Sequence, residues 1–310
     1  MALALPVAAA AQEPPSADSL AAWWARVRAD STDARAWLSL GQAYVARASL
    51  YHTRHRAPDS AEAPAALDSA QDAFLRAAQS TGALRDTALV FRVFTWGEAA
   101  LLAWERGGIE AAARVGAAMP PGLRLPAVVA ELGENLLRAC PDEGVLLTAD
   151  DVDTYAAWFL RFGRGLRPDL LILPWQVWRT DPVLRERLAD ELRLPRAPTA
   201  QGDETAVLRA IAQRRPLCAS IAFAQPPGER PRLDWRPAPL VWLAGPQALS
   251  GTAAPGDFTF EAARMARDAG DAWAAPVLGF YRRAAGTAPA LCVAFETFEL
   301  GADTGCRRAG

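Results

Sequence analysis

The chain has 310 residues, a formal charge of −2 and an apolar fraction of 51%, which is enough for two domains that each bury a core. The small negative charge excludes the basic excess of a typical nucleic-acid-binding protein, so no nucleic-acid partner is expected. The chain has no lysine and only two histidines, His52 and His55. Lysine-dependent phosphate loops, Schiff bases and Ser–Lys pairs are therefore excluded. A Ser–His–Asp relay would have to use one of the two histidines, and the sequence contains no G-x-S-x-G elbow to supply the serine.

Residues 1–16 begin with an apolar stretch of mainly small residues that ends near an Ala-x-Ala pattern. This composition is typical of the back half of a secretory signal peptide, although the basic n-region is missing. We expect a signal-like or disordered tail and a periplasmic or exported protein, with a cytoplasmic location as the alternative. No apolar run approaches the ~18–20 residues of a membrane span, so we expect no transmembrane segment.

The four cysteines have no metal-binding spacing. Cys218 and Cys292 lie in apolar runs, which predicts buried free thiols. A bridge between Cys292 and Cys306 is the alternative if the protein is exported, and the disulfide state of Cys140 stays open.

Residues 17–140 have the spacing of amphipathic helices. One piece fits the W-x2-L-G-x2-Y core of a tetratricopeptide repeat, and an A-x3-F pattern follows it. We expect small residues of this set to let paired helices approach and its aromatic residues to fill the space between them. The predicted repeat-packing positions are Trp37, Leu40, Gly41, Tyr44, Ala70 and Phe74.

Residues 47–63 are an apparent insertion between the two repeat helices, and we interpret its two histidines as part of a solvated basic loop rather than a metal or anion site.

Further helices are expected over 86–106, 109–118 and 124–139, with Gly107-Gly108 and Pro120-Pro121 as breaks. Two interpretations stay open. The helices form a repeat surface that binds a partner, or they are a helical hairpin that packs on the neighbouring domain.

After residue 140 the pattern changes to alternating short apolar runs and helical segments. "GVLLTA", "RPDLLILPW", "PLCASIAFA" and "RPAPLVWLAG" read as strands, and helices are expected between the first three. "TDPVLRERLADEL" has Thr180 or Asp181 as a helix cap and Pro182 in the first turn. The predicted fold class is α/β. A tetratricopeptide-like helical region (17–140) precedes an open, mainly parallel sheet domain (141–250), and a C-terminal helical segment (251–310) packs on either domain.

Ligands in open α/β sheets bind beyond the carboxyl ends of the strands. The first strand is followed by an acidic cluster and the second by an aromatic residue and an amide, whereas no Gly-rich phosphate loop is present. The candidate ligand or metal residues are Asp150, Asp151, Asp153, Thr154, Trp175 and Gln176.

The stretch 142–182 resembles a segment of the soluble C-terminal region of bacterial membrane glycosyltransferase-like proteins, which are relatives of transmembrane protein O-mannosyltransferases. The matching positions are Asp151, Asp153, Thr154, Tyr155, Trp158, Leu160, Gly165, Arg167, Pro168, Asp169, Thr180 and Asp181. Val152 replaces the asparagine of that family's Gly-Asp-Asn-Asp-Thr. The multi-helix membrane portion that carries sugar transfer in such enzymes has no counterpart in this sequence, so the resemblance implies a stand-alone module without the catalytic body.

Three interpretations of the aspartates follow. Carboxylates at a helix start cap free N–H groups and interact with the helix dipole. The D-x-D pattern of Asp151 and Asp153 is also the motif by which glycosyltransferases hold a divalent cation and a sugar nucleotide. A contact with a partner protein is the third interpretation.

We therefore expect a non-enzymatic binding or scaffold protein of the bacterial cell envelope, with no cofactor. Its partner would be a protein of a membrane-associated complex, in which this chain is an accessory subunit. The alternative is a metal-dependent sugar- or nucleotide-handling enzyme that uses Asp151 and Asp153 with a divalent cation. Eleven tryptophans supply interface anchors or core packing, and exposure of Trp23 and Trp24 would favour the first use.

Overall fold

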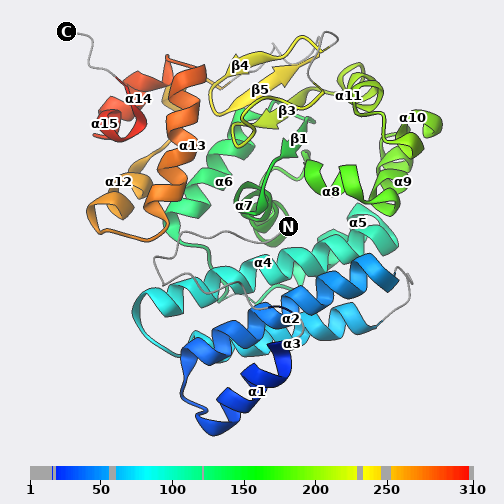
Figure 1. Ribbon diagram of the computed structural model, residues 1–310. Coiled ribbons are helices and arrows are strands. Elements are labelled where there is room, and N and C mark those ends of the chain that lie inside the picture. The colour runs from blue at the N-terminus through cyan, green and yellow to red at the C-terminus, as the bar shows by residue number, and fades with distance from the viewer. Residues whose placement is uncertain are drawn as a thin grey trace. The chain divides into compact units, whose positions relative to one another are not determined.

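The computed structural model describes residues 16, 19–55, 61–120, 122–228, 233–245 and 253–306, without the side chains of residues 50–55 and 197. The chain divides into two compact units, Met1–Pro126 and Ala127–Gly310. Figure 1 shows the helical first unit in blue to cyan and the mixed second unit in green to red. The helix Ala127–Ala139 (α6), which was predicted as part of the helical region 17–140, belongs to the second unit.

The first unit is built from helices that pack on their neighbours in the chain. Gly108, at φ 75°, ends the fourth helix and starts the fifth, as the Gly107-Gly108 pair predicts. The helices are α1 Leu20–Ala29, α2 Ala34–His55, α3 Glu62–Ala77, α4 Gly82–Gly107 and α5 Ile109–Ala117.

The predicted insertion between the repeat helices is largely helical. Helix α2 continues to His55, because the segment from Arg47 to His55 contains no glycine or proline and Pro58 is the first residue that opposes a helix. The interpretation of the two histidines as a solvated loop is therefore wrong for their backbone, which lies in the last turns of α2. Their side chains lie outside the described residues.

Helices α2 and α3 approach most closely at Gly41. A Cβ atom on Gly41 would lie within 2.4 Å of Cε1 of Phe74, and Phe74 is fully buried and stacks on Phe91 of α4 with ring centroids 5.3 Å apart. Leu40 and Ala70 are fully buried as well. The predicted packing positions thus join α2, α3 and α4, while the tetratricopeptide assignment itself stays a prediction.

The second unit contains a five-stranded mixed sheet with strand order β2-β1-β3-β5-β4. Strand β1 pairs in parallel with β2 on one side and β3 on the other. Strand β5 pairs antiparallel with both of its neighbours, β3 and β4. This confirms a mixed α/β fold. The strands are β1 Val145–Thr148, β2 Leu171–Pro174, β3 Leu217–Ser220, β4 Arg236–Ala238 and β5 Val241–Ala244.

The run 236–245, predicted as one strand, forms the β4–β5 hairpin instead. Leu240 adopts a left-handed backbone with φ 63°, and it follows Pro239, which favours a turn. The chain therefore reverses in the middle of the apolar run.

Helices connect the parallel strands, and Asp181 caps α9 with Pro182 in its first turn, as predicted. In the edge strand β2, the N–H of Leu171 points toward β1 and donates to the carbonyl of Gly144. Because the backbone polar groups of successive residues in a strand point to opposite sides, the carbonyl group of Ile172 points away from the sheet. The indole N–H of Trp158 donates to that carbonyl at 3.2 Å. The connecting helices are α7 Asp151–Trp158, which continues into a π-helical turn Phe159–Gly163, α8 Trp175–Thr180, α9 Pro182–Glu191, α10 Arg196–Gln201 and α11 Glu204–Ala212.

The C-terminal segment is helical, as predicted, and its first two α-helices pack on α6. It comprises a 3₁₀ turn Pro255–Asp257, then α12 Glu261–Asp268, α13 Ala274–Thr287, α14 Leu291–Thr297 and α15 Gly301–Thr304. None of the helices in the described part of the chain combines the length and hydropathy needed to cross a membrane.

Both cysteine pairs are disulfides. Cys140 at the end of α6 is bonded to Cys218 on β3, and Cys292 on α14 is bonded to Cys306. The prediction of free thiols at Cys218 and Cys292 is therefore wrong, and the alternative Cys292–Cys306 bridge is confirmed. The apolar run around Cys218 predicts its burial correctly, whereas Cys292 is only half-buried. An apolar run contains no information about a partner that lies 78 residues away in the sequence.

Candidate functional site

The acidic cluster lies where strand β1 passes into helix α7. Asp150 is the N-cap, and its carboxylate accepts from the backbone N–H groups of Val152 and Asp153 at 3.1 and 3.5 Å. In return, the carboxylate of Asp153 accepts from the N–H groups of Asp150 and Ala149 at 2.9 and 3.0 Å. This is a capping box in which aspartate takes the place of the usual glutamate.

Asp153 is completely buried. Burial raises the pKa of its carboxyl group well above the ordinary value, and the nearby charge of Asp150 raises it further, whereas hydrogen bonds from Ala149, Ser220 and Asp150 oppose the shift. Ser220 is the last residue of β3. Asp153 therefore links the start of α7 to the carboxyl ends of two strands.

Thr154 extends the same connection. Its hydroxyl group donates to the hydroxyl oxygen of Thr148 at 2.7 Å, and the Thr148 hydroxyl donates to the carbonyl of Leu173 at 3.4 Å. Helix α7, strand β1 and strand β2 are thereby connected through buried side chains.

Asp151 and Asp153 do not point to the same place. Residues two apart on a helix diverge rather than face each other, and Asp151 is half-buried whereas Asp153 has no exposed surface. The described residues contain no cluster of three or more His, Cys, Asp or Glu side chains that could hold a metal ion. The D-x-D pattern thus occurs in a geometry that separates its two carboxylates.

Trp175 and Gln176 follow the second strand, as predicted, but they have different surroundings. Trp175 is buried and stacks on Trp178, with ring centroids 4.3 Å apart, and neither indole N–H group has a hydrogen-bond partner among the residues that the structure describes. Gln176 is exposed and accepts from the guanidinium of Arg179 at 3.4 Å. Neither residue hydrogen-bonds to the aspartates among the described residues, so the structure groups Asp150, Asp153 and Thr154 and leaves these two apart.

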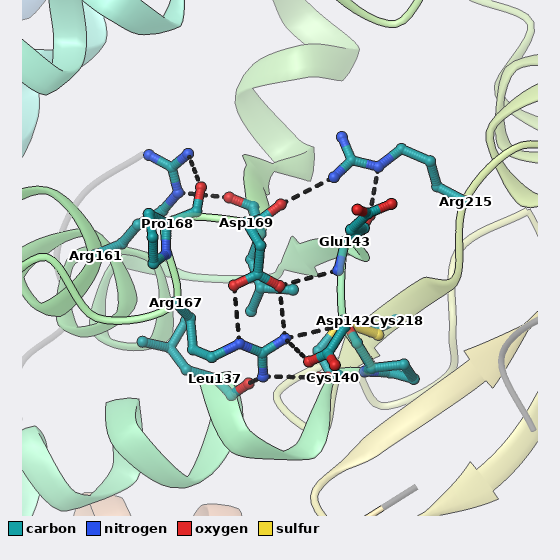
Figure 2. A network of polar contacts seen from close by, with 12 residues as sticks. Leu137, Cys140, Asp142, Glu143, Arg161, Arg167, Pro168, Asp169, Arg215 and Cys218 are labelled. Atoms are coloured by element: carbon teal, nitrogen blue, oxygen red, sulfur yellow. Dashed lines mark hydrogen bonds and ion pairs between the residues drawn. A yellow bond between two sulfur atoms is a disulfide. The ribbon is translucent and has the colours of Figure 1, made fainter. Parts of the chain in front are cut away.

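A second polar network lies at the opposite end of the parallel strands, and none of its residues is among the predicted ligand or metal residues. Figure 2 shows Arg167 between the end of α6 and Asp169. Its guanidinium donates to the carbonyl groups of Leu137 and Cys140 at 2.8 and 3.1 Å and to both carboxylate oxygens of Asp169 at 3.0 and 2.8 Å. These bonds satisfy carbonyl groups that the helix end leaves open.

Asp169 extends this network to the loops before the other strands. Its carboxylate accepts from the N–H of Glu143 at 2.9 Å, and its carbonyl accepts from Arg215 at 2.9 Å. The hydrogen bond from Arg167 is the main reason that the pKa of Asp169 is lowered to about 2. The stretch 165–169, which is part of the resemblance, therefore connects the end of α6 to the loops that precede the parallel strands.

The first unit carries a group of aromatic and arginine side chains on and beside α1, which we call the α1 cluster. Trp24 lies edge-on to Trp37 with ring centroids 6.1 Å apart, and its indole N–H donates to the hydroxyl of Tyr44 at 2.8 Å. Arginine guanidinium groups lie 4.7 Å from the Trp23 ring centroid and 4.8 Å from that of Trp37. The cluster consists of Trp23, Trp24, Arg26, Trp37, Tyr44 and Arg76.

Comparisons with known proteins found no matching family model, no similar curated protein and no similar solved structure.

Proposed function

We propose that this chain is a non-enzymatic binding protein of the bacterial cell envelope, where it serves as an accessory subunit of a membrane-associated complex. The observation that carries the proposal is the α1 cluster. Trp24 is 38% exposed although it is anchored by a hydrogen bond and a ring contact. Tryptophan, tyrosine and arginine are the residue types that dominate the binding energy of protein interfaces.

The α1 cluster is held in place before any partner binds. The Trp24 ring is fixed by Trp37 and Tyr44, and a side chain that is already ordered loses less conformational entropy on association. Arg26 and Arg76 are exposed next to the rings, so the complementary surface is an apolar patch with acidic groups at its rim.

The two disulfides support a location in an oxidising compartment. Disulfides persist in the periplasm and outside the cell, whereas the reducing cytoplasm keeps thiols free. The Cys140–Cys218 bridge joins two buried residues of the sheet unit, so it is part of the core rather than a surface feature. The signal-like N-terminal sequence agrees with this location.

The arrangement of the aspartates supports the non-enzymatic part of the proposal. Both oxygens of Asp153 accept backbone N–H groups, and one oxygen of Asp150 accepts from the N–H groups of Val152 and Asp153. A glycosyltransferase-like use of Asp151 and Asp153 with a divalent cation would require these bonds to break and the two side chains to converge.

Site-specific photo-cross-linking in the host cell tests the binding role. A photoreactive residue at position 24 is expected to give a discrete cross-linked product with an envelope protein. Arg26→Glu is expected to lower the yield at least several-fold, because it reverses a charge at the rim. Arg85→Glu is the matched control, since Arg85 is an exposed arginine on α4 of the same unit and outside the α1 cluster, and the yield should stay unchanged. No product at position 24, or equal loss in both variants, would overturn the proposal.

A further inference from the structure

The two disulfides differ in their access to solvent. Cys140 and Cys218 are 1% and 0% exposed, and the sulfur of Cys140 packs so closely on the backbone at Gly144 that a Cβ atom there would lie 2.7 Å from it. Cys292 and Cys306 are both half-buried. Only the second bridge therefore offers its sulfur atoms to a thiol in solution while the chain is folded.

The chain around Cys292 leaves the approach to this bridge uncovered. Pro289 and Ala290, just before it, are exposed, and Val293, just after it, is 71% exposed. The rate at which a thiolate attacks a disulfide depends on its access to one of the two sulfur atoms. The position of the bridge at the surface of α14 therefore favours exchange with an external thiol.

Other contacts hold the two cysteines near each other without the bridge. Gly305 has a left-handed backbone with φ 78°, and the N–H of Cys306 donates back to the carbonyl of the first residue of α15 at 2.9 Å. Arg267 on α12 binds the carboxylate of Asp303 at 2.8 Å, and Arg282 on α13 donates to the carbonyl of Asp303 at 2.9 Å. Opening the bridge therefore leaves α15 in place on α12 and α13, and the two sulfur atoms stay close enough to pair again.

The hydroxyl group of Thr304 makes the two sulfur atoms unequal. It lies 3.5 Å from Sγ of Cys306, and its hydrogen is shared with the carbonyl groups of Leu300 and Gly301 at 2.9 and 3.3 Å. A hydrogen bond to an ionised acceptor is stronger than one to a carbonyl group, so the hydroxyl favours a thiolate at Cys306. A stabilised thiolate is the better leaving group. Cys292 is therefore the sulfur that is attacked.

We propose that Cys292–Cys306 is a reversible thiol–disulfide exchange site, which a dithiol donor opens while the chain stays folded. A thiolate of the donor attacks Sγ of Cys292, the S–S bond of the bridge breaks, and its electron pair leaves with Cys306, which takes up a proton. The second thiolate of the donor then attacks the donor sulfur of this mixed disulfide and releases Cys292 as a thiol. The donor is oxidised from a dithiol to a disulfide, and the bridge is reduced to two thiols.

The reverse reaction with a disulfide closes the bridge again. Opening releases Cys306 from α14 and presents two thiols at the surface of the second unit. The site does not depend on the binding role of the α1 cluster, which lies in the first unit.

Reduction of the folded full chain with dithiothreitol, used as the dithiol probe, tests the proposal. Samples are quenched with acid and alkylated, and mass spectrometry follows each cysteine. Cys292 and Cys306 should be labelled together, at least about tenfold faster than Cys140 and Cys218. The helical circular dichroism should be retained, and oxidised glutathione should close the bridge again. Equal rates at the two bridges, or loss of the helical signal when the second bridge opens, would overturn the proposal.

Two substitutions at Val293 distinguish exchange in the folded chain from reduction after unfolding. The position is exposed, so neither is expected to disturb the fold. Val293→Glu should slow the reduction of Cys292–Cys306 several-fold at low salt because it repels the attacking thiolate, and Val293→Arg should accelerate it. The difference should shrink in 1 M salt. An equal rate in both variants and the wild type at low salt would contradict direct attack on the folded chain.

Glutathione, a monothiol, tests the direction of attack. It should form its mixed disulfide at Cys292 and leave Cys306 as the free thiol that is alkylated. A mixed disulfide at Cys306 instead would contradict the role assigned to Thr304.

Discussion

At the scale of single residues, neighbouring aspartates of one short motif have different roles. Asp153 is fully buried and completes a capping box, whereas Asp151 is half-buried on another side of the same helix turn. Removing the Asp153 carboxylate leaves the N–H groups of Ala149 and Asp150 without their acceptors. An unsatisfied buried group costs about 1–3 kcal/mol.

We therefore predict that Asp153→Ala lowers the free energy of unfolding by roughly 2–6 kcal/mol, on the basis of two such groups. Asp151→Ala is the matched control and should lower it by less than about 1 kcal/mol, as is usual for a partly exposed position. Urea denaturation of both variants measures the difference. Equal losses would show that the capping box does not hold the junction.

At the scale of secondary-structure elements, the close contact between α2 and α3 depends on the absence of a side chain at Gly41. A methyl group there would collide with the buried ring of Phe74. Gly279 in α13 offers a contrast, because a Cβ atom on it would meet nothing within 4 Å. The same substitution should thus have opposite effects at the two sites.

Gly41→Ala is expected to lower the free energy of unfolding by about 1–3 kcal/mol through overpacking. Gly279→Ala is expected to raise it by up to about 1 kcal/mol, because alanine favours a helix more than glycine does. Thermal unfolding followed by circular dichroism compares the two variants. Stabilisation by Gly41→Ala would mean that α2 and α3 are not in close contact.

The disulfides connect elements across very different stretches of sequence. Cys140–Cys218 closes a loop of 78 residues and Cys292–Cys306 one of 14. In the chain-entropy model, the longer loop stabilises by about 4.5 kcal/mol and the shorter by about 3 kcal/mol. The double variant Cys140→Ser, Cys218→Ser should therefore lose more stability than Cys292→Ser, Cys306→Ser in guanidinium denaturation under oxidising conditions. The reverse order, or no loss in either, would contradict this assignment.

At the scale of the whole molecule, local patterns predicted the elements and the α/β class well. The helix start at Asp181-Pro182, the helix break at Gly108 and the strands at Val145, Leu171 and Leu217 all follow from the periodicity and capping signals around them. The order of the strands, the pairing of Cys140 with Cys218 and the role of Arg167 depend on contacts between distant residues. A single sequence does not contain that information.

The same limit applies to the candidate site. Capping of a helix start is one of the three interpretations that the sequence offers for the aspartates, and Asp150 is such a cap after the first strand. The sequence cannot show that Asp153 is buried against Ser220, because that contact depends on the position of β3. Nor can it show that Trp175 lies in the core and Gln176 at the surface, since both simply follow the second strand.

We propose that the carboxylates after the first strand hold the fold and do not bind a metal ion. Calorimetric titration of the full chain with Mn²⁺, alone and together with a nucleotide-sugar, tests it most directly. We predict no saturable heat at millimolar ligand, because both oxygens of Asp153 and one oxygen of Asp150 accept backbone N–H groups. Saturable binding that disappears in a folded Asp151→Asn variant would contradict the claim and would favour the metal-dependent enzyme.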